Sequence, residues 1–542
     1  MNYLTAYQKR KWKRHELERI YSNLPTTITS SIKDICPDHD VITNANVKLL
    51  SQWISVKKYS CVQIVSAFCY SAYQAHIKFN CITECLFEDA LKRATLLDNH
   101  DEKDSLPLRG IPFSCKDTFD VIGVDTSMGY GNRTFEPAIA NSAVVQGFIL
   151  LGAIVICKTN VPQSLFATEC SNNVFGYTVN PSNTKYTPGG SSGGEGALLK
   201  CNGAAFGIGS DIAGSIRFPS GYCGIYGLRP SQARSINKGL QILKGDLMIK
   251  VVVGPMTRSS DDLQLLFRLM SSQVFFKLDP TTVPLLYKEI TAKSLKIGYF
   301  IHTDFIQASP ASQRGVLMAV NKLQRHGHNV VPILVNNATD MFANAMKIFT
   351  ADGAHGVTHT KGDLPEKWLY LLFVLIYTPD ILIKLFLFIL SFLNDKSLGL
   401  FLSNFYTKTS VEMEESSALR MQHIHEYVDM MKINKLDAML CPIASTPAHL
   451  TNAFDKTALG NYYSVLYSYL DMPVVAHPMT TVEKVDEWDV PVVNFAEKIL
   501  KQMYDPSVAL PVGIQIAALP YQEEMAIHIS KILNTEVELV QR

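Results

Sequence analysis

The sequence lacks an excess of charge of either sign, because its 50 lysines and arginines are balanced by 49 aspartates and glutamates, for a formal net charge of +1. Such a chain has no overall positive field to attract a polyanion, so we expect no nucleic-acid partner. Charge is concentrated locally in the basic run at residues 9–14. This run is typical either of one solvated face of a helix or of a contact with anionic lipid head groups.

The sequence also lacks the signs of a secreted or metal-binding protein. Residues 1–20 are basic and polar and contain no apolar stretch like that of a secretory leader. The 11 cysteines are an odd number and are scattered singly, and the closest pair, Cys81 and Cys85, has no second pair or histidine cluster at zinc-site spacing. We therefore expect free cysteines in the core, an intracellular cytosol-facing location, and neither a metal nor a cofactor.

What the chain does contain is apolar material, which makes up 47% of its 542 residues and suffices for a large core. Apolar residues recur at helical spacing over residues 47–97, and short apolar runs alternate with helical windows after residue 105. Strands that alternate with helices predict an α/β fold built on a β-sheet. We place an N-terminal helical extension at residues 1–58 and the main domain at residues 59–542.

Residues 189–227 are unusually rich in glycine and serine, a composition that is typical of flexible linkers. The same segment carries apolar and aromatic residues such as Phe206, Phe218 and Tyr222, which a linker would leave in water. We therefore expect its glycines to permit tight turns and close backbone approach inside a packed core.

The most apolar stretch, residues 368–393, is long enough for one membrane-spanning helix, which needs ~20 apolar residues. Pro379 and Asp380 divide it, and Lys384 lies in its second part, so neither part is long enough to span a bilayer. Two helices lying in one leaflet, as a monotopic membrane cap inserted at about residues 365–402, fit this pattern best. A buried core hairpin and a true transmembrane helix are the alternatives.

Residues 209–219, GSDIAGSIRFP, place a serine directly after small residues. Amide cleavage needs an activated nucleophile, donors for the oxyanion and an acid for the departing nitrogen, because the carbonyl is resonance-stabilised and the amine leaves poorly. Small residues before the serine let successive backbone N–H groups turn toward one point. We therefore predict that Ser215 is the nucleophile and that an oxyanion nest is formed by Ile212, Ala213, Gly214 and Ser215.

That segment, together with GGSSGGEGALL at residues 189–199, resembles the signature of the amidase-signature family. GIPFSCKDTFD at residues 110–120 is similar to the family's lysine motif, and residues 160–181 are similar to the segment that lines its acyl pocket. Residues 466–474 and 510–524 look like the animal fatty-acid amide hydrolase branch. The resemblance implies the family's fold, a large twisted mixed β-sheet surrounded by α-helices, with residues 59–542 as the amidase catalytic domain.

Carried over position by position, the resemblance implies a Ser-Ser-Lys triad with Lys116 as base, Ser191 as bridge and Ser215 as nucleophile, and with Ser191 also touching substrate. A lysine acts as a base only when its pKa is lowered, and burial against apolar neighbours is the usual means. Ser192 resembles a serine that supports the lysine, and Arg217 resembles an arginine that braces the nucleophile loop. A purely structural role is an equal alternative for these two residues.

The resemblance also implies substrate contacts. Leu165 and Phe166 resemble positions that touch the acyl chain, and Tyr521 stands where relatives often carry tryptophan; ordinary core is the alternative for all three. The chain departs from the family at Ala213-Gly214, where two glycines are usual. If Ala213 had to adopt a left-handed conformation, its methyl group would strain the nest and turnover would fall.

The activity implied by the resemblance is that of a membrane-associated serine hydrolase. It would cleave fatty-acid amides, namely N-acylethanolamines and primary fatty amides, to free fatty acid and amine through an acyl-enzyme. Its expected partners are a lipid amide and an endomembrane bilayer reached through residues 368–393, and a homodimer is compatible with the sequence. The N-terminal transmembrane helix of some relatives has no counterpart before Lys9.

Four other functions stay open at this point. Residues 189–193, GGSSG, also satisfy the G-x-S-x-G pattern of an α/β-hydrolase-type esterase, in which Ser191 would be the nucleophile. A general amidase, or the amidase subunit of a tRNA-dependent amidotransferase, would carry the same signature without acting on lipid. A membrane-bound pseudoenzyme would only hold lipid.

Overall fold

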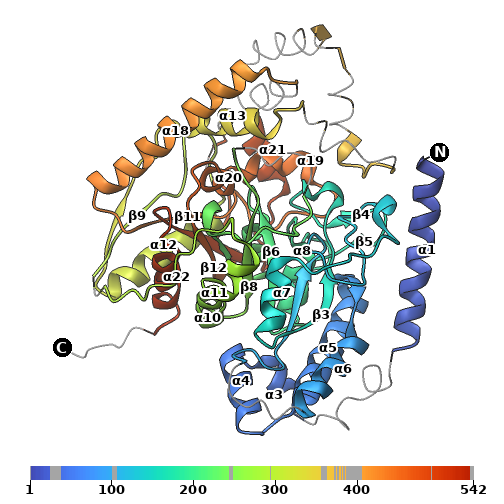
Figure 1. The fold of residues 1–542 in the computed structure, drawn as a ribbon. Helices are drawn as coiled ribbons and strands as arrows, with labels where there is room; N and C mark the ends of the chain where they lie inside the picture. The colour runs from blue at the N-terminus through green and yellow to red at the C-terminus, as the bar shows by residue number, and fades with distance from the viewer. Residues whose placement is uncertain are drawn as a thin grey trace.

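The computed structural model has one large β-sheet through its middle, with helices packed around it (Figure 1). The first described helix, α1 (Asn2–Ser22), lies along one side of the molecule, and the last, α22 (Glu523–Ile532), lies away from it toward the opposite side. The residues that the structure describes are 2–24, 38–99, 106–242, 248–292, 294–353, 355, 363–370, 374, 378–379, 381–382, 385, 406–489, 491–492 and 494–536.

Within these residues the main sheet has 11 strands. In spatial order they are β1 (Ile82–Cys85), β3 (Ile154–Thr159), β2 (Pro112–Lys116), β6 (Phe206–Asp211), β8 (Val252–Thr257), β7 (Tyr226–Arg229), β12 (Val474–Thr481), β13 (Pro511–Ala518), β11 (Ala438–Pro442), β9 (Lys296–Tyr299) and β10 (Asn329–Pro332). Strands β4 (Ser171–Asn172) and β5 (Gly176–Tyr177) form a separate pair. Strand β2 runs parallel to both of its neighbours, whereas β6 and β8 pair in antiparallel fashion. The predicted α/β fold with a large mixed sheet is therefore confirmed.

Helices pack around this sheet. After α1 they are α3 (His39–Asn44), α4 (Val47–Ser55), α5 (Cys61–Phe79), α6 (Phe87–Asn99), α7 (Ala143–Leu150), α8 (Gly193–Lys200), α9 (Arg217–Cys223), α10 (Ser260–Met270), α11 (Gln273–Leu278), α12 (Pro310–Arg325), α13 (Ala338–Phe349), α18 (Ser410–Ile433), α19 (Phe454–Thr457), α20 (Tyr462–Tyr469), α21 (Phe495–Met503) and α22 (Glu523–Ile532). Short 3-10 turns are η2 (Gly131–Arg133), η3 (Gln163–Leu165), η4 (Gln232–Arg234) and η5 (Ala458–Asn461).

Side chains on the central strands alternate between two separate parts of the core, as the two-residue period of a strand requires. On β12, Val475 joins the cluster that includes residues of α12 and α22, whereas Ala476 joins the cluster that includes residues of α9. Both faces of the sheet are thus covered by helices, which explains why its strands read as short apolar runs rather than as alternating ones.

The region predicted to be helical over residues 47–97 contains a strand as well. Helix α5 begins with a capping box between Ser60 and Gln63 and ends at Asn80, whose left-handed conformation turns the chain. The next residues form β1, which pairs with β3, before α6 begins. The helical spacing over residues 47–97 did not reveal this strand, because four residues are too few for their periodicity to distinguish a strand from a helix.

The glycine-rich residues 189–227 are packed as expected. They form α8, β6 and α9, in which nearly every residue is buried. The ten cysteines within the described residues are all free, and most of them are buried.

The predicted membrane cap falls largely outside the described residues. Those of its side chains that are described are mostly exposed and apolar, namely Tyr370, Val374, Ile381, Leu382 and Leu385. Within the part of the chain that the structure describes, none of the helices combines the length and the apolar character needed to cross a bilayer.

Candidate active site

Lys116 is the last residue of β2 and lies in the middle of the protein, between β3 and β6. Its side chain is 0% exposed. Burial lowers the pKa of Lys116 to about 7, against the opposing influence of Asp211, Cys170 and Glu195. A substantial fraction of this amine is therefore neutral near neutral pH.

Ser191 lies in the turn before α8, and the peptide bond that precedes it is cis. The turn fits closely against the chain at residues 167–169: a Cβ atom on Gly190 would lie 2.3 Å from the Ala167 carbonyl oxygen and 2.2 Å from that of Glu169. Only glycine fits at this position. The segment that carries Leu165 and Phe166 therefore runs directly past Ser191.

The three residues predicted as the triad lie in one line of hydrogen bonds. A hydrogen bond of 2.8 Å joins Lys116 Nζ to Ser191 Oγ, and one of 2.9 Å joins Ser191 Oγ to Ser215 Oγ; each hydroxyl can donate or accept, as can a neutral amine. Ser191 is 1% exposed and Ser215 is 9% exposed, so the outer end of the line is the most accessible. The arrangement allows a proton to pass from Ser215 to a neutral Lys116 through Ser191.

The loop between β6 and α9 contains the predicted oxyanion nest. Within the described residues, the backbone N–H groups of Ile212, Ala213 and Ser215 have no hydrogen-bond acceptor, so they are available to an oxyanion. Gly214 differs from the expectation, because its N–H already donates to Asp211 Oδ1 at 2.7 Å and can reach an oxyanion only as a shared donor. Of the four residues predicted to form the nest, Gly214 is therefore the one whose N–H group already has a protein partner.

The departure from two glycines creates no backbone strain. Gly214 has φ of 126°, and a Cβ atom there would lie 2.2 Å from the Phe218 ring. Ala213 does not have a positive φ. The residue that must be glycine is therefore Gly214, and the methyl group of Ala213 is tolerated.

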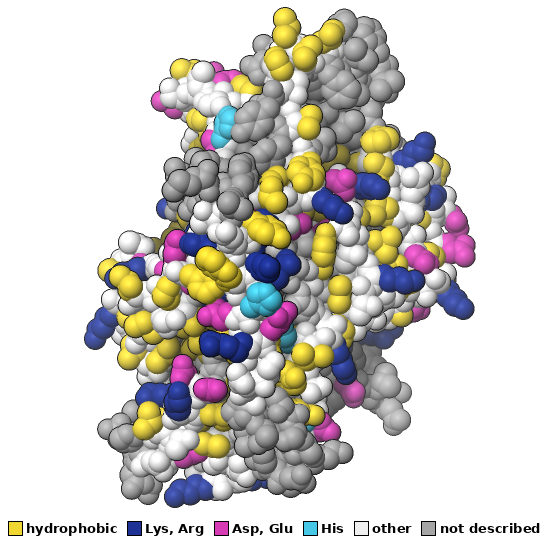
Figure 2. Space-filling view, turned by 90° about the vertical axis from the view of Figure 1, so that its right-hand side faces the viewer, with side chains coloured by type: hydrophobic (Ala, Val, Ile, Leu, Met, Phe, Trp, Pro, Cys, Tyr) yellow, Lys and Arg dark blue, Asp and Glu magenta, His cyan; other side chains and the backbone are white. Residues whose placement is uncertain are grey.

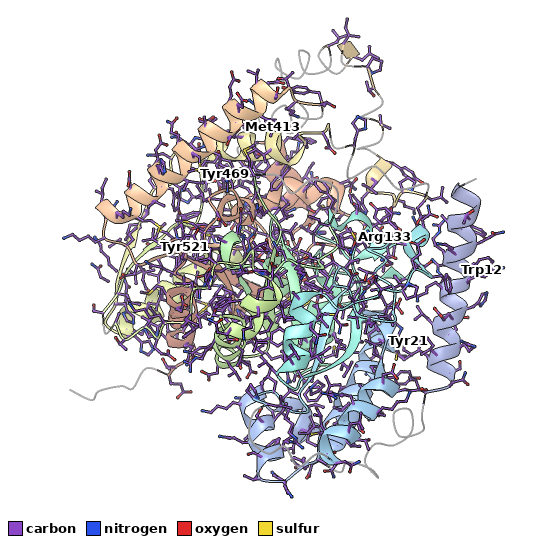
Figure 3. All side chains as sticks on the ribbon, in the orientation of Figure 1. Trp12, Tyr21, Arg133, Met413, Tyr469 and Tyr521 are labelled. Atoms are coloured by element: carbon purple, nitrogen blue, oxygen red, sulfur yellow. The ribbon has the colours of Figure 1, made fainter. Side chains whose placement is uncertain are left out.

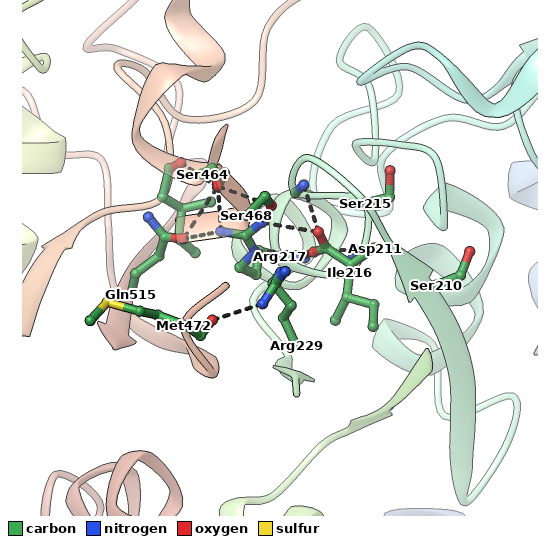
Figure 4. Close-up of polar contacts among 12 residues, drawn as sticks. Ser210, Asp211, Ser215, Ile216, Arg217, Arg229, Ser464, Ser468, Met472 and Gln515 are labelled. Carbon is green, nitrogen blue, oxygen red and sulfur yellow. Dashed lines mark hydrogen bonds and ion pairs between the residues drawn. The ribbon is translucent and has the colours of Figure 1, made fainter. Parts of the chain in front are cut away.

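Arg217 anchors the nucleophile loop to the other half of the sheet (Figure 4). Its guanidinium forms two hydrogen bonds to Asp211, at 3.0 and 2.9 Å. It also donates to the Ser464 carbonyl and Gln515 Oε1, each at 2.7 Å, and to Ser468 Oγ at 2.7 Å. Burial alone would raise the pKa of Asp211, but Arg217 and nearby backbone N–H groups lower it to about 2. Asp211 therefore stays ionised, and its carboxylate holds the loop between β6 and α9 by accepting hydrogen bonds from backbone N–H groups of that loop.

Ser210 was not predicted, yet it contacts the lysine directly. Lys116 Nζ donates to Ser210 Oγ at 3.0 Å and to the Ser210 carbonyl oxygen at 3.3 Å. Ser192, the predicted support, reaches the lysine only indirectly, through its own hydrogen bond to the same carbonyl at 3.4 Å. The available signal was the position of Ser210 near the end of the strand that leads into the nucleophile loop.

Glu195 is a second buried residue that was not predicted. Its carboxyl accepts hydrogen bonds from Ser114 Oγ at 2.6 Å and Thr159 Oγ1 at 2.9 Å. Burial raises the pKa of Glu195 to about 8, although both hydroxyls and Lys116 oppose the rise. The carboxyl is therefore mostly protonated near neutral pH and adds little negative charge beside the lysine.

Phe166 belongs to an aromatic cluster. Its ring stacks on Trp368 with ring centroids 6.5 Å apart, and Trp368 meets Phe454 edge-on at 5.4 Å. Leu165 has φ of 63° and lies in the turn just before it. Tyr521 is 46% exposed on a turn beside Arg234, so it is not part of the buried core.

The mixed sheet, the buried lysine and the two serines are the features expected of an amidase. Comparisons with a family model, with related sequences and with solved structures agree with this class. The family model described as Amidase matches residues 63–527. The chain is 34% identical to fatty-acid amide hydrolase 1 of Sus scrofa over 78% of this chain and 75% of that protein. It is 31% identical to fatty acid amide hydrolase 1 of Caenorhabditis elegans over 88% and 86% of the two chains.

The structural comparison gives the same result. A solved structure of a fatty acid amide hydrolase superposes with a TM-score of 0.83 at 25% identity, covering 98% of this chain and 95% of that one. The chain therefore belongs to the amidase-signature family and is an amide C–N hydrolase. This fold does not fit the α/β-hydrolase interpretation of residues 189–193.

Proposed function

We propose that this chain hydrolyses fatty-acid amides through an acyl-enzyme on Ser215, with Ser191 as bridge and Lys116 as base. The observation that carries the catalytic part is the continuous hydrogen-bonded line from Lys116 Nζ through Ser191 Oγ to Ser215 Oγ, at 2.8 and 2.9 Å. The inner end of this line is a fully buried amine whose pKa is lowered to about 7.

The first half of the reaction forms the acyl-enzyme. Neutral Lys116 accepts the Ser191 proton while Ser191 accepts the Ser215 proton, and Ser215 Oγ attacks the amide carbonyl carbon. The oxyanion is held by the N–H groups of Ile212, Ala213 and Ser215, each typically worth about 3 kcal/mol in such sites. The tetrahedral intermediate collapses, the C–N bond breaks, and the proton returns through Ser191 to the leaving nitrogen.

The second half releases the acid. Water attacks the acyl carbonyl while the same line of residues removes its proton, and the ester bond to Ser215 breaks as the proton returns to Ser215 Oγ. The products are a free carboxylic acid and an amine.

Three observations support a fatty acyl group. Two relatives and the superposed structure are named as fatty-acid amide hydrolases. The aromatic cluster of Phe166, Trp368 and Phe454 offers an apolar wall next to the segment that passes Ser191. We infer N-acylethanolamines and primary fatty amides as the substrate class.

The described cap side chains support contact with a membrane. Val374, Ile381, Leu382 and Leu385 are all more than half exposed, and hydrophobic side chains project at the top of the face shown in Figure 2. Exposed apolar side chains that are grouped together mark an interaction surface. We propose monotopic attachment to the cytosol-facing side of an endomembrane through residues 368–393, with a homodimer as a further expectation.

The nucleophile is tested by labelling with a fluorophosphonate and mapping the adduct by peptide mass spectrometry. The adduct is expected on Ser215, and Ser191→Ala should slow the labelling without moving it. An adduct on Ser191 in the wild-type enzyme would contradict the assignment.

The substrate class is tested with a panel of amides that share one assay. Oleamide and oleoylethanolamide are expected to be hydrolysed with the highest kcat/KM, ahead of acetamide and glutamine. Preference for acetamide would indicate a general amidase, and preference for glutamine an amidotransferase subunit.

Membrane contact is tested by sedimentation with phospholipid vesicles. Leu382→Asp combined with Leu385→Asp should release the protein into the supernatant. Leu334→Asp is the matched control, because Leu334 is 74% exposed in a different part of the chain, after β10. Wild-type protein that does not sediment with vesicles would refute the attachment.

A further inference from the structure

Helix α1 presents positively charged side chains to the protein. Arg10 and Lys13 are 7% and 4% exposed, whereas Lys11 and Trp12 of the same basic run lie on the exposed side. Figure 3 shows Trp12 on the outer side of the helix and Tyr21 turned toward α5. Burying a cation is costly unless it is paired, so the partners of Arg10 and Lys13 show what the helix holds in place.

Lys13 attaches the helix to the catalytic domain. Its Nζ lies 2.7 Å from Glu84 in β1 and 2.9 Å from Asp125. The helix also approaches η2 closely, because a Cβ atom on Gly131 would lie 2.4 Å from Arg10 Cγ. These contacts fix the position of Arg10.

Arg10 holds the described segment 363–370. Its Nε lies 3.4 Å from Asp363 Oδ1, and the other oxygen of Asp363 accepts a hydrogen bond from the Gly131 N–H. Burial raises the pKa of both Asp363 and Glu366, and Arg10 opposes the rise in each. Arg10 is thus the counter-ion of Asp363, and its positive charge also favours the ionised form of Glu366.

The same segment is fastened to the turn that carries Phe166. The Gln163 side chain donates to the Leu364 carbonyl at 3.0 Å and accepts from the Glu366 N–H at 2.8 Å. Asn173 donates to the same Leu364 carbonyl at 2.9 Å. A second tie comes from α1, because Arg14 donates to the Asn173 carbonyl at 2.6 Å.

The contacts of residues 363–370 with α1 and with Gln163 and Asn173 determine the position of the Trp368 side chain. It follows Glu366 by two residues and lies between Phe166 and Phe454. If residues 363–370 shifted, the Trp368 indole would move relative to the Phe166 ring. The apolar surface that we assign to the acyl chain would then change its shape.

We infer that α1 is part of the substrate-selecting machinery, in which Arg10 is a positioning residue that sets Trp368 against Phe166 and thereby favours long acyl chains. This inference rests on the proposed function, since it assumes that Phe166 contacts the acyl group. The buried residues of the basic run, Arg10 and Lys13, thus contact the rest of the protein rather than lipid.

The test compares Arg10→Met with Lys11→Met, which removes a neighbouring charge from the exposed side of the same helix. Hydrogen exchange is followed in the peptide that contains residues 363–370, whose Leu364 and Glu366 N–H groups donate to Asp363 and Gln163. The kcat/KM ratio for oleamide over butyramide is measured on the same samples. Arg10→Met should speed the exchange and lower the ratio about tenfold, because remote binding contacts position the reacting group. Lys11→Met should change neither.

Asp363→Asn removes the same ion pair from its other side and must reproduce both effects. Unchanged exchange in Arg10→Met and Asp363→Asn would overturn the anchoring by α1. Faster exchange with an unchanged ratio would overturn the selecting role. If wild-type enzyme fails to cleave oleamide, the fatty-acyl assignment fails together with the selecting role, while the exchange data still decide the anchoring.

Discussion

The buried base should leave a mark on protein stability that can be measured without any substrate. The pKa of Lys116 falls from 10.5 in an exposed lysine to about 7 in the folded protein. Between these two values the unfolded chain binds one proton more than the folded chain at this position. The free energy of unfolding contributed by Lys116 therefore rises with pH across this window, by about 1.4 kcal/mol per pH unit where the difference is one full proton.

Lys116→Met removes this contribution while keeping a side chain of similar length. Between about pH 8.5 and 9.5, the free energy of unfolding of the wild type should gain roughly 1.3 kcal/mol on that of the variant. Urea unfolding followed by circular dichroism measures both slopes, and groups that titrate alike in the two proteins cancel in the difference. Lys11→Met, which removes an exposed lysine, is expected to keep the wild-type slope.

Equal slopes in the wild type and Lys116→Met would refute the reasoning. They would mean that Lys116 keeps its proton in the folded protein across this range and cannot act as a base near neutral pH. This outcome would stand even if Lys116→Met were inactive, because loss of activity alone does not separate a base from a structural lysine.

Three further predictions follow from the site. Because only neutral Lys116 is a base, kcat/KM should rise with pH through about 7 and at pH 6 reach roughly one tenth of its plateau; a pH profile centred near 10 would contradict this. Gly214→Ala should slow fluorophosphonate labelling by about 100-fold or more, because position 214 has a positive φ and the added methyl group would collide with the Phe218 ring. The labelling rate of Ala213→Gly should stay within about twofold of the wild-type rate. Arg217→Lys should lower the free energy of unfolding by about 3 kcal/mol in urea titrations, because an ammonium cannot replace the five hydrogen bonds of the buried guanidinium; a loss under about 1 kcal/mol would show that the network in Figure 4 is not needed.

The sequence was sufficient to predict the α/β sheet and the proximity of Lys116, Ser191 and Ser215, because the motifs containing them are contiguous and distinctive. It could not show that Asp211 takes the Gly214 N–H, since that depends on how the loop folds back on the strand before it. Nor could it identify Ser210 as a contact of Lys116, because the two residues come from neighbouring strands whose order appears only in the folded sheet.

The basic run at residues 9–14 shows a different limit of sequence reasoning. A solvated helix face and a lipid contact were the two interpretations, and neither describes Arg10 or Lys13, which are buried in ion pairs. Their partners lie far away in the sequence, at Asp363, Glu84 and Asp125. A cluster of charged residues predicts a solvent-exposed helix face only if no carboxylate from a distant part of the sequence pairs with it in the folded protein. The local sequence pattern does not reveal such partners.

The structure also explains how the protein tolerates an uncharged lysine at its centre. Taking Lys116 out of water costs stability at every pH below its exposed value, and its own hydrogen bonds to Ser191 and Ser210 offset only part of this. Asp211 follows Ser210 on β6 and is kept ionised by Arg217. Its carboxylate accepts hydrogen bonds from backbone N–H groups of the loop that carries Ser215. If Asp211 instead formed a close ion pair with Lys116, the amine would keep its proton and the base would be lost. Arg217 therefore keeps Asp211 bound to the loop, where it cannot form the close ion pair that would hold Lys116 in its charged form.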